Sequence, residues 1–145
     1  MGEQVKKAGL QLCYHNHGLE FEPLADGRRP LDVLMGAVKP ELVKLELDVF
    51  WVSITGADPV SLINEYKGRI ALMHLKDKMK GAPVSLTESV PPTTFVEVGS
   101  GALDFPSIVK AAQAAGVQHF FVEQDQTPGD PLESIRKSYQ YLKTL

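Results

Sequence analysis

The chain has little cysteine, no long hydrophobic run and no excess of basic residues, and each absence excludes a class of protein. Its single cysteine, Cys13, cannot form a disulfide within the chain, so a reducing cytoplasm is the expected compartment. No apolar stretch approaches the roughly 20 residues that cross a bilayer, so we expect no membrane partner. A net charge of −3 argues against a nucleic-acid partner, because DNA and RNA binding requires a basic surface.

What is present predicts a series of short buried strands. Four segments are apolar at most positions and are bounded by polar or turn residues, as expected for strands covered on both faces: residues 10–14, 43–47, 70–75 and 119–122. Four helical patterns lie between and after them: residues 31–38, 59–66, 105–115 and 131–142. Three of these helices follow an aspartate that can cap them, Asp58, Asp104 or Asp130.

This order predicts an α/β fold with four βα units and a parallel sheet. Four units are half of a (β/α)₈ TIM barrel, and 145 residues are roughly half of a typical barrel chain of about 250. Residues 4–8 resemble the last turns of a helix whose own strand is missing, so we interpret residues 1–145 as a single domain, the C-terminal half-barrel. A compact flavodoxin-like sheet is the alternative. The proline-rich segment 78–95 is expected to be a lid or a disordered insertion.

Polar side chains gather at the C-terminal end of each predicted strand. They are His15, His17 and Glu20 after the first, Glu46 and Asp48 in the second, His74 and Lys76 in the third, and Glu123 after the fourth. The C-terminal strand ends of a parallel barrel converge on one face, so these side chains are expected to share one pocket. Buried acids need a counter-charge, which a divalent cation would supply.

The same residues resemble a known family. The chain carries the motifs Tyr14-His15-Asn16-His17-x-x-Glu20-Phe21, Glu46-Leu47-Asp48, His74-Leu75-Lys76-Asp77 and Val122-Glu123. Together they are similar to the xylose isomerase-like TIM-barrel superfamily and, within it, to the sugar phosphate isomerase/epimerase group. The resemblance covers essentially the whole chain.

The resemblance implies one divalent metal ion held by Glu, Asp, His and Glu. Asp48, His74 and Glu123 match three of these ligands. Glu20 is the expected fourth ligand, with His15 or His17 as the alternative, because relatives carry a glutamate where this sequence has His15. Three carboxylates and one imidazole favour Mn²⁺, Mg²⁺ or Co²⁺, with Zn²⁺ as a further choice.

The function implied is isomerisation or epimerisation of a keto-sugar or sugar phosphate by proton transfer through an enediolate. Glu20 and Glu123 are the expected acid/base groups, and His15 and His17 are alternative bases that a dehydratase would need. Lys76 and Trp51 are the expected contacts with the sugar. An inosose dehydratase-like lyase and an inactive, self-associating half-barrel are the alternatives. Endonuclease IV shares the superfamily, but four histidines and a negative charge oppose a DNA enzyme with three metals.

The expected partners are a small sugar and a second half of the barrel. A four-stranded arc leaves two unpaired edges, and edges of this kind template pairing with another chain. We expect the inner face of the arc to be rich in Leu, Val and Phe, so that a homodimer would complete the barrel; a missing N-terminal half is the alternative. Gly99-Ser100-Gly101 is expected to be a plain turn, with phosphate binding at a helix N-terminus as the rival interpretation.

Overall fold

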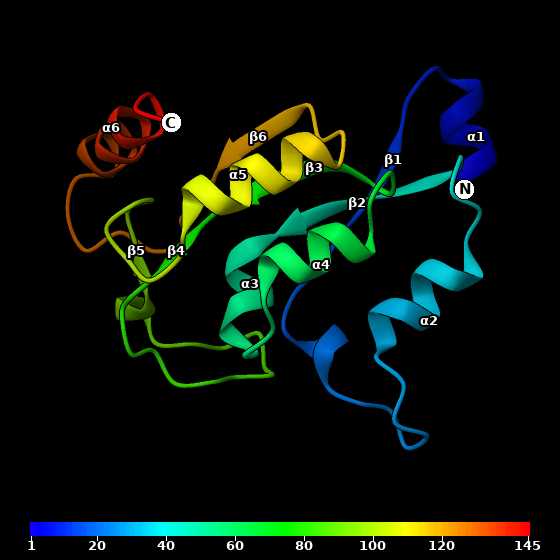
Figure 1. The fold of residues 1–145 in the computed structure, drawn as a ribbon, viewed down its shortest axis with the longest axis horizontal. Coiled ribbons are helices and arrows are strands. Elements are labelled where there is room, and N and C mark those ends of the chain that lie inside the picture. The colour runs from blue at the N-terminus through cyan, green and yellow to red at the C-terminus, as the bar shows by residue number, and fades with distance from the viewer.

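A parallel four-stranded sheet forms the centre of the molecule, and the computed structural model describes residues 1–145 (Figure 1). Its strands are β1 (Leu12–His15), β2 (Val43–Asp48), β3 (Ile70–Leu75) and β6 (His119–Val122). They lie in the order β1-β2-β3-β6 and every neighbouring pair is parallel. The predicted α/β class and half-barrel sheet are therefore confirmed. A flavodoxin-like sheet would break this sequential order.

Helices cover one face of the sheet and create the core. α2 (Pro30–Ala37), α4 (Pro59–Glu65) and α5 (Phe105–Ala114) each begin with a proline in the first turn, where its missing N–H costs nothing. Leu45, Leu47, Met73 and Leu75 of the two central strands are buried in the same cluster as residues of these helices. Side chains alternate along a strand, so this set defines the helix-facing side of β2 and β3.

The opposite face of the sheet corrects one expectation. By the same alternation it carries Glu46 on β2, Leu72 and His74 on β3, and Phe121 on β6. We expected a face rich in Leu, Val and Phe, but the aliphatic residues of the strands face the helices instead. The inner face is mixed, and its polar members point toward the end of the sheet where the strands finish.

One helix was absent from the prediction. α3 (Val49–Ile54) follows β2 without a break, and all six of its residues are buried. A short helix that is apolar on every side has no amphipathic period, so its sequence does not distinguish it from a continuing strand. Asp48 caps it and thereby turns the chain sharply at the strand end.

The segment after β3 is a folded loop. β4 (Asp77–Lys78) pairs antiparallel with β5 (Phe95–Val96), and the short 3₁₀ helix η2 (Pro92–Thr94) precedes β5. Within the loop, the Ser85 N–H donates to Ile54 O over 2.9 Å. Figure 1 shows the loop beyond the C-terminal ends of the strands, beside α3. It thus borders the end of the sheet where the candidate site lies, as the lid interpretation expects.

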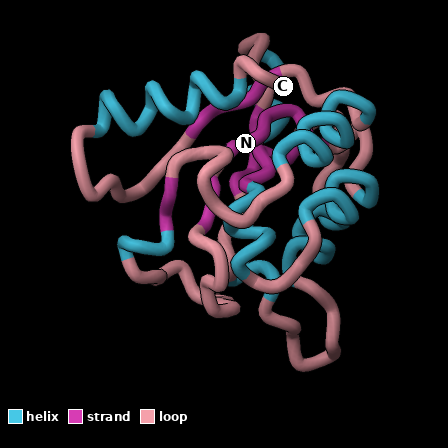
Figure 2. The backbone as a smooth tube through the Cα atoms, turned by 60° about the vertical axis from the view of Figure 1, so that its left-hand side comes forward, coloured by secondary structure: helices cyan, strands magenta, loops and turns pink.

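The two terminal helices lie at the margins of the fold. α1 (Gly2–Lys7) precedes β1, and α6 (Pro131–Leu142) runs along one side of the molecule, apart from the helix layer (Figure 2). α6 turns Ser134 and Ser138 inward, while the stripe Leu132, Ile135 and Tyr139 is exposed. No helix has both the length and the apolar character of a bilayer-spanning segment.

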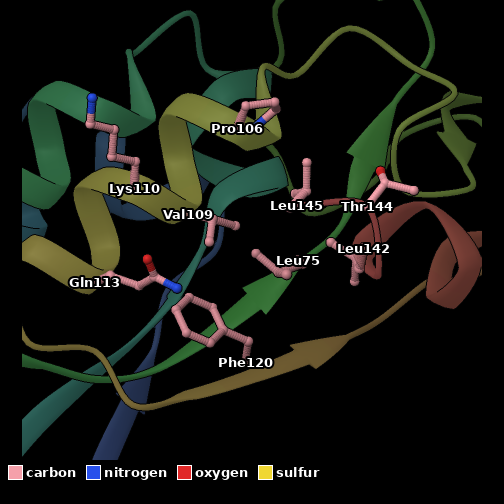
Figure 3. A pocket seen from close by; sticks show the side chains of 9 residues that line it. All are labelled: Leu75, Pro106, Val109, Lys110, Gln113, Phe120, Leu142, Thr144 and Leu145. Atoms are coloured by element: carbon pink, nitrogen blue, oxygen red, sulfur yellow. The ribbon is translucent and has the colours of Figure 1, made fainter.

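A cavity of about 590 Å³ lies between α5 and the end of the chain, on the helix side of the sheet (Figure 3). Leu75 and Phe120 form its floor, while Val109 and Gln113 of α5 and Leu142 of α6 line its sides. It contains none of the predicted site residues. The cavity fills the space between α5 and the C-terminal end of α6.

Candidate metal centre

Four side chains converge at the C-terminal end of the sheet. His15, Asp48, His74 and Glu123 each offer one ligand atom, and these four atoms lie within 4.8 Å of one another. Each comes from a different strand: His15 ends β1, Asp48 ends β2, His74 is next to last in β3, and Glu123 follows β6. Asp48 and His74 are direct partners in the β2–β3 ladder, so strand register alone places them together.

Asp48 is fully buried, and its two oxygens have different partners. Oδ1 accepts the backbone N–H groups of Phe50 and Trp51 at 2.9 and 3.1 Å, which caps α3. Oδ2 lies 3.3 Å from His15 Nε2 and 3.6 Å from His74 Nδ1. Burial opposes ionisation of Asp48, but its contacts with His15 and His74 and the charge of Lys76 outweigh burial and hold its pKa well below the usual range. Asp48 therefore presents one charged oxygen, Oδ2, to the centre of the group.

His74 and Glu123 provide the test of whether a cation fits. His74 Nδ1 lies 2.8 Å from Glu123 Oε2 and is buried without a partner in hydrogen-bonding geometry, whereas Glu123 Oε2 also lies 2.8 Å from Lys76 Nζ. The nearby Asp48 carboxylate raises the pKa of His74 against the opposing effect of burial, and the charges of Glu123 and Glu46 act in the same direction. Buried polar atoms without partners are costly. The two imidazoles and two carboxylates of the group fit a divalent metal ion, which would give the buried His74 Nδ1 a partner.

Lys76 supplies a fixed positive charge beside the group. It is only 1% exposed, and its Nζ lies 3.1 Å from Asp48 Oδ2, 2.8 Å from Glu123 Oε2 and 2.8 Å from Asp125 Oδ1. Burial lowers the pKa of Lys76, but its carboxylate neighbours outweigh burial and raise it. The expected contact between Lys76 and substrate does not follow from this geometry, because its ammonium is already enclosed by three acids.

Glu20, the expected fourth ligand, lies outside the group of four. Its Oε1 accepts a hydrogen bond from the Tyr14 hydroxyl, and its Oε2 accepts the backbone N–H of His17 over 2.9 Å. The physical reason is the 3₁₀ helix η1 (Leu19–Phe21), which folds Glu20 back over the end of β1. His15, the alternative ligand, occupies the place that Glu20 was expected to fill.

His17 and Trp51 lie beside the metal centre. The ring centroids of His15 and His17 are 4.6 Å apart, as the one-residue spacing predicts, and the His17 ring is 5.3 Å from that of Trp51. Trp51 packs with Phe50 and Phe95 and is largely buried. Trp51 thus forms a wall next to His17, and its indole N–H is buried without a hydrogen-bond partner.

Three residues that shape the site were not among the predicted functional residues. The Asn16 side chain accepts Asp48 N–H over 3.0 Å and donates to Asp48 O over 3.4 Å, which extends the β1–β2 ladder by one step. Glu46 Oε1 lies 3.0 Å from His74 Nε2, and Asp125 pairs with Lys76. The signal for Glu46 was its position two residues before Asp48, on the same face of β2.

The Gly99-Ser100-Gly101 loop is a turn built around an internal carboxylate. Asp77 accepts the backbone N–H groups of Gly99, Gly101, Ala102 and Leu103 over 2.9–3.2 Å. A Cβ atom at Gly101 would lie 2.2 Å from Lys78 O, so only glycine fits there. The donors that a phosphate would need are already engaged, which supports the plain turn.

The chain is similar in sequence and fold to known proteins. The family model described as xylose isomerase-like TIM barrel matches residues 1–145. The chain is 29% identical to the inosose dehydratases of Lacticaseibacillus casei and Geobacillus thermodenitrificans, over 98% and 99% of its own length and 50% of theirs. A crystal structure of a sugar phosphate isomerase/epimerase from Parabacteroides distasonis matches with a TM-score of 0.79 at 31% identity, over 98% of this chain and 48% of that one.

The chain thus spans about half the length of the relatives that it matches. Sequence similarity, a sequential parallel sheet and polar groups at the C-terminal strand ends agree with one another. The chain belongs to the xylose isomerase-like TIM barrel family.

Proposed function

We propose that this chain forms half of a metal-dependent sugar isomerase or epimerase that moves a proton on the carbon next to a carbonyl group. The observation that carries the proposal is the convergence of His15, Asp48, His74 and Glu123, together with the buried His74 Nδ1 that lacks a hydrogen-bond partner. The similarity to a sugar phosphate isomerase/epimerase supports the substrate class.

The residues around the group suit the chemistry. A bound divalent ion would act as a Lewis acid on the carbonyl oxygen of a keto-sugar and so make the neighbouring proton more acidic. His17 is half-buried next to His15 and Trp51, so its imidazole can accept a proton from a sugar lying against the indole. Glu123 is the most exposed member of the group and can return a proton from the other side. Lys76 keeps the buried Asp48 ionised.

The donor set narrows the choice of metal. The expected set had three carboxylates, whereas the structural group has two imidazole nitrogens and two carboxylate oxygens. Imidazole ligands suit first-row transition metals, while Mg²⁺ prefers oxygen. We therefore favour Mn²⁺, Co²⁺ or Zn²⁺ over Mg²⁺.

An inosose dehydratase-like lyase is the second candidate, and the specific observation in its favour is the similarity to two inosose dehydratases. Elimination of water begins with the same removal of a proton next to the carbonyl. His15 and His17 side by side offer the additional acid that a departing hydroxyl group needs.

One exchange experiment tests the shared step. The chain, loaded with Mn²⁺ or Co²⁺, is incubated in D₂O with keto-sugars that include inosose, and the carbon-bound proton is followed by NMR and the product by mass. Deuterium uptake without loss of water supports the epimerase or isomerase, and loss of one water supports the lyase. Absence of exchange with every keto-sugar, in a preparation that binds the metal, contradicts both and favours an inactive module.

We also propose that the 145-residue chain associates with a second copy. β1 and β6 each have one unpaired edge, and the apolar stripe of α6 (Leu132, Ile135 and Tyr139) is exposed. Exposed edges and contiguous apolar surface both favour association. An N-terminal half, as in relatives twice as long, would occupy the same edges.

Sedimentation at micromolar concentration tests this association. The expected mass is twice that of one 15.9 kDa chain. A single species near 15.9 kDa with a cooperative melting transition would contradict it.

A further inference from the structure

Glu46 is a half-buried carboxylate with a single charged neighbour. Its side chain is 24% exposed and its Oε1 lies 3.0 Å from His74 Nε2. No lysine or arginine lies within ion-pair distance of it, unlike Asp48 and Glu123, which both contact Lys76. Its position therefore calls for an explanation that involves His74.

The two nitrogens of His74 face different surroundings. Nε2 faces Glu46, whereas Nδ1 faces Asp48 Oδ2 at 3.6 Å and Glu123 Oε2 at 2.8 Å and has no hydrogen-bond partner. A neutral imidazole carries its proton on one nitrogen and a lone pair on the other. Only a lone pair on Nδ1 can contribute to a cation held by Asp48 and Glu123.

We propose that Glu46 is a positioning residue that accepts the Nε2 proton of His74, and so keeps the Nδ1 lone pair directed at the metal centre. This inference rests on the proposed metal site. A metal-bound histidine commonly donates its second N–H to a carboxylate, which fixes the tautomer and the orientation of the ring.

The sheet itself enforces this arrangement. Glu46 and Asp48 are two residues apart on β2, so their side chains share a face, and Asp48 is the ladder partner of His74 on β3. The ring of His74 is flanked by those of His15 and Phe121, at centroid distances of 4.5 and 6.3 Å. The imidazole is thus held between two acids of one strand, with a different nitrogen facing each.

Glu46 is not itself a member of the metal-binding group. The four converging residues are His15, Asp48, His74 and Glu123, and the contact of Glu46 is to Nε2, the nitrogen that faces away from Glu123. Its expected contribution is therefore to the geometry and basicity of His74.

Three variants separate the effects of the carboxylate. Glu46→Ala removes both the charge and the acceptor, whereas Glu46→Gln removes the charge but keeps an oxygen acceptor at the same place. Glu41→Ala, at an exposed position shortly before β2, is the matched control for loss of a negative charge. Zn²⁺ affinity is measured by competition calorimetry, and the proton position on His74 by long-range ¹H–¹⁵N NMR of the zinc-loaded protein.

The unaltered protein should show zinc on Nδ1 and a proton on Nε2 of His74. Glu46→Ala should lower the Zn²⁺ affinity 10- to 100-fold and expose the Nε2 proton to rapid exchange with water. Glu46→Gln should keep an affinity close to that of the unaltered protein and a protected Nε2 proton, and Glu41→Ala should change neither.

Three results would overturn the inference: coordination through Nε2, unchanged affinity in Glu46→Ala, or a Glu46→Gln variant as weak as Glu46→Ala. The NMR spectrum of the unaltered protein decides the tautomer even if Glu46→Ala does not fold. Failure of the unaltered protein to bind zinc would overturn the proposed metal site itself, which distinguishes the two failures.

Discussion

The two central strands and the two edge strands contribute to the metal centre in different ways. Asp48 and His74 come from β2 and β3, which have neighbours on both sides, and their side chains are 0% and 14% exposed. His15 and Glu123 come from or follow β1 and β6, which have one neighbour each, and are 25% and 40% exposed. Half of the centre is therefore fixed by the interior of the sheet.

The difference extends to the residues that support each ligand. The two site residues on the central strands are held by further groups: Asp48 by Asn16 and the start of α3, and His74 by Glu46 on the neighbouring strand. Of the two edge ligands, His15 has a single charged contact, with Asp48, whereas Glu123 contacts Lys76 and His74. We infer that the central pair is preorganised, and that the edge pair depends more on what covers the sheet edges.

The largest effect is expected from Asp48→Asn. Metal affinity should fall by more than about 100-fold, because a charged ligand is lost. Mutation of a residue that only hydrogen-bonds to a ligand already lowers metal affinity about 10- to 100-fold. The free energy of unfolding should fall by about 3 kcal/mol, because buried Lys76 loses one partner. Calorimetric metal titration and urea unfolding measure the two effects.

Asp58→Asn is the matched control, because Asp58 is also an extended residue whose carboxylate caps a helix, but it is exposed and is not one of the four converging residues. Asn and Asp are nearly equal as caps, so its effect should stay within about 0.5 kcal/mol. Metal binding by Asp48→Asn at the affinity of the unaltered protein would contradict the role of the central pair.

A smaller effect is expected at the edges. Glu123→Gln and His15→Asn should each lower metal affinity by about 100-fold, which is less than the loss in Asp48→Asn but no less than the loss caused by changing a residue behind a ligand. The deficit should shrink when the chain is concentrated enough to associate, because coverage of β1 and β6 would order both side chains. Titrations at low and high protein concentration give the comparison. Equal losses for edge and central variants would remove the distinction.

The pH dependence of stability should separate Asp48 from Glu123 in the metal-free protein. Burial opposes ionisation of both, but neighbouring groups outweigh it and hold each pKa below its usual value; for Glu123 the main such group is Lys76. A carboxyl group with a lowered folded-state pKa stabilises the fold above its unfolded pKa of about 4, and this contribution is lost as the pH falls through the folded value.

Unfolding free energies measured between pH 7 and pH 3 should therefore fall on acidification. The slope should be shallower in Asp48→Asn than in Glu123→Gln, because the exposed Glu123 is better screened by water. A slope that is unchanged in Asp48→Asn would show that the buried carboxylate does not carry the acid sensitivity.

The smallest effect on metal binding is expected from His17→Ala, which changes the loop beyond the edge strand β1. Metal affinity should remain near that of the unaltered protein, since His17 is not one of the converging ligands. Deuterium exchange into the sugar should slow by about 100-fold, the usual contribution of a general base. An unchanged exchange rate would leave His17 with a structural role only.

Much of this architecture follows from local sequence signals. Strand positions follow from short apolar segments, and Asp58, Asp104 and Asp130 cap the helices that follow them, as their positions predict. Strand-end placement also predicts that Asp48, His74 and Glu123 meet, because parallel strands finish at one edge.

The remaining features depend on tertiary contacts that no local pattern specifies. Glu20 has a carboxylate, the ligand type that the site needs. A single 3₁₀ turn places this carboxylate where it accepts hydrogen bonds from Tyr14 and His17 instead. From the sequence alone, Lys76 is indistinguishable from a solvated lysine. In the structure, Glu123 and Asp125, which follow β6, contact its ammonium group. The tautomer of His74 likewise depends on which strand lies beside β3.

The most direct test of the central claim is the anomalous scattering map of crystals of the 145-residue chain grown with Mn²⁺, Co²⁺ or Zn²⁺. We expect one peak at the C-terminal end of the sheet, with His15, Asp48 Oδ2, His74 Nδ1 and Glu123 about 2.0–2.3 Å from the ion. A peak coordinated by Glu20 in place of His15 would contradict the ligand set. No peak among these four side chains would contradict the metal centre altogether.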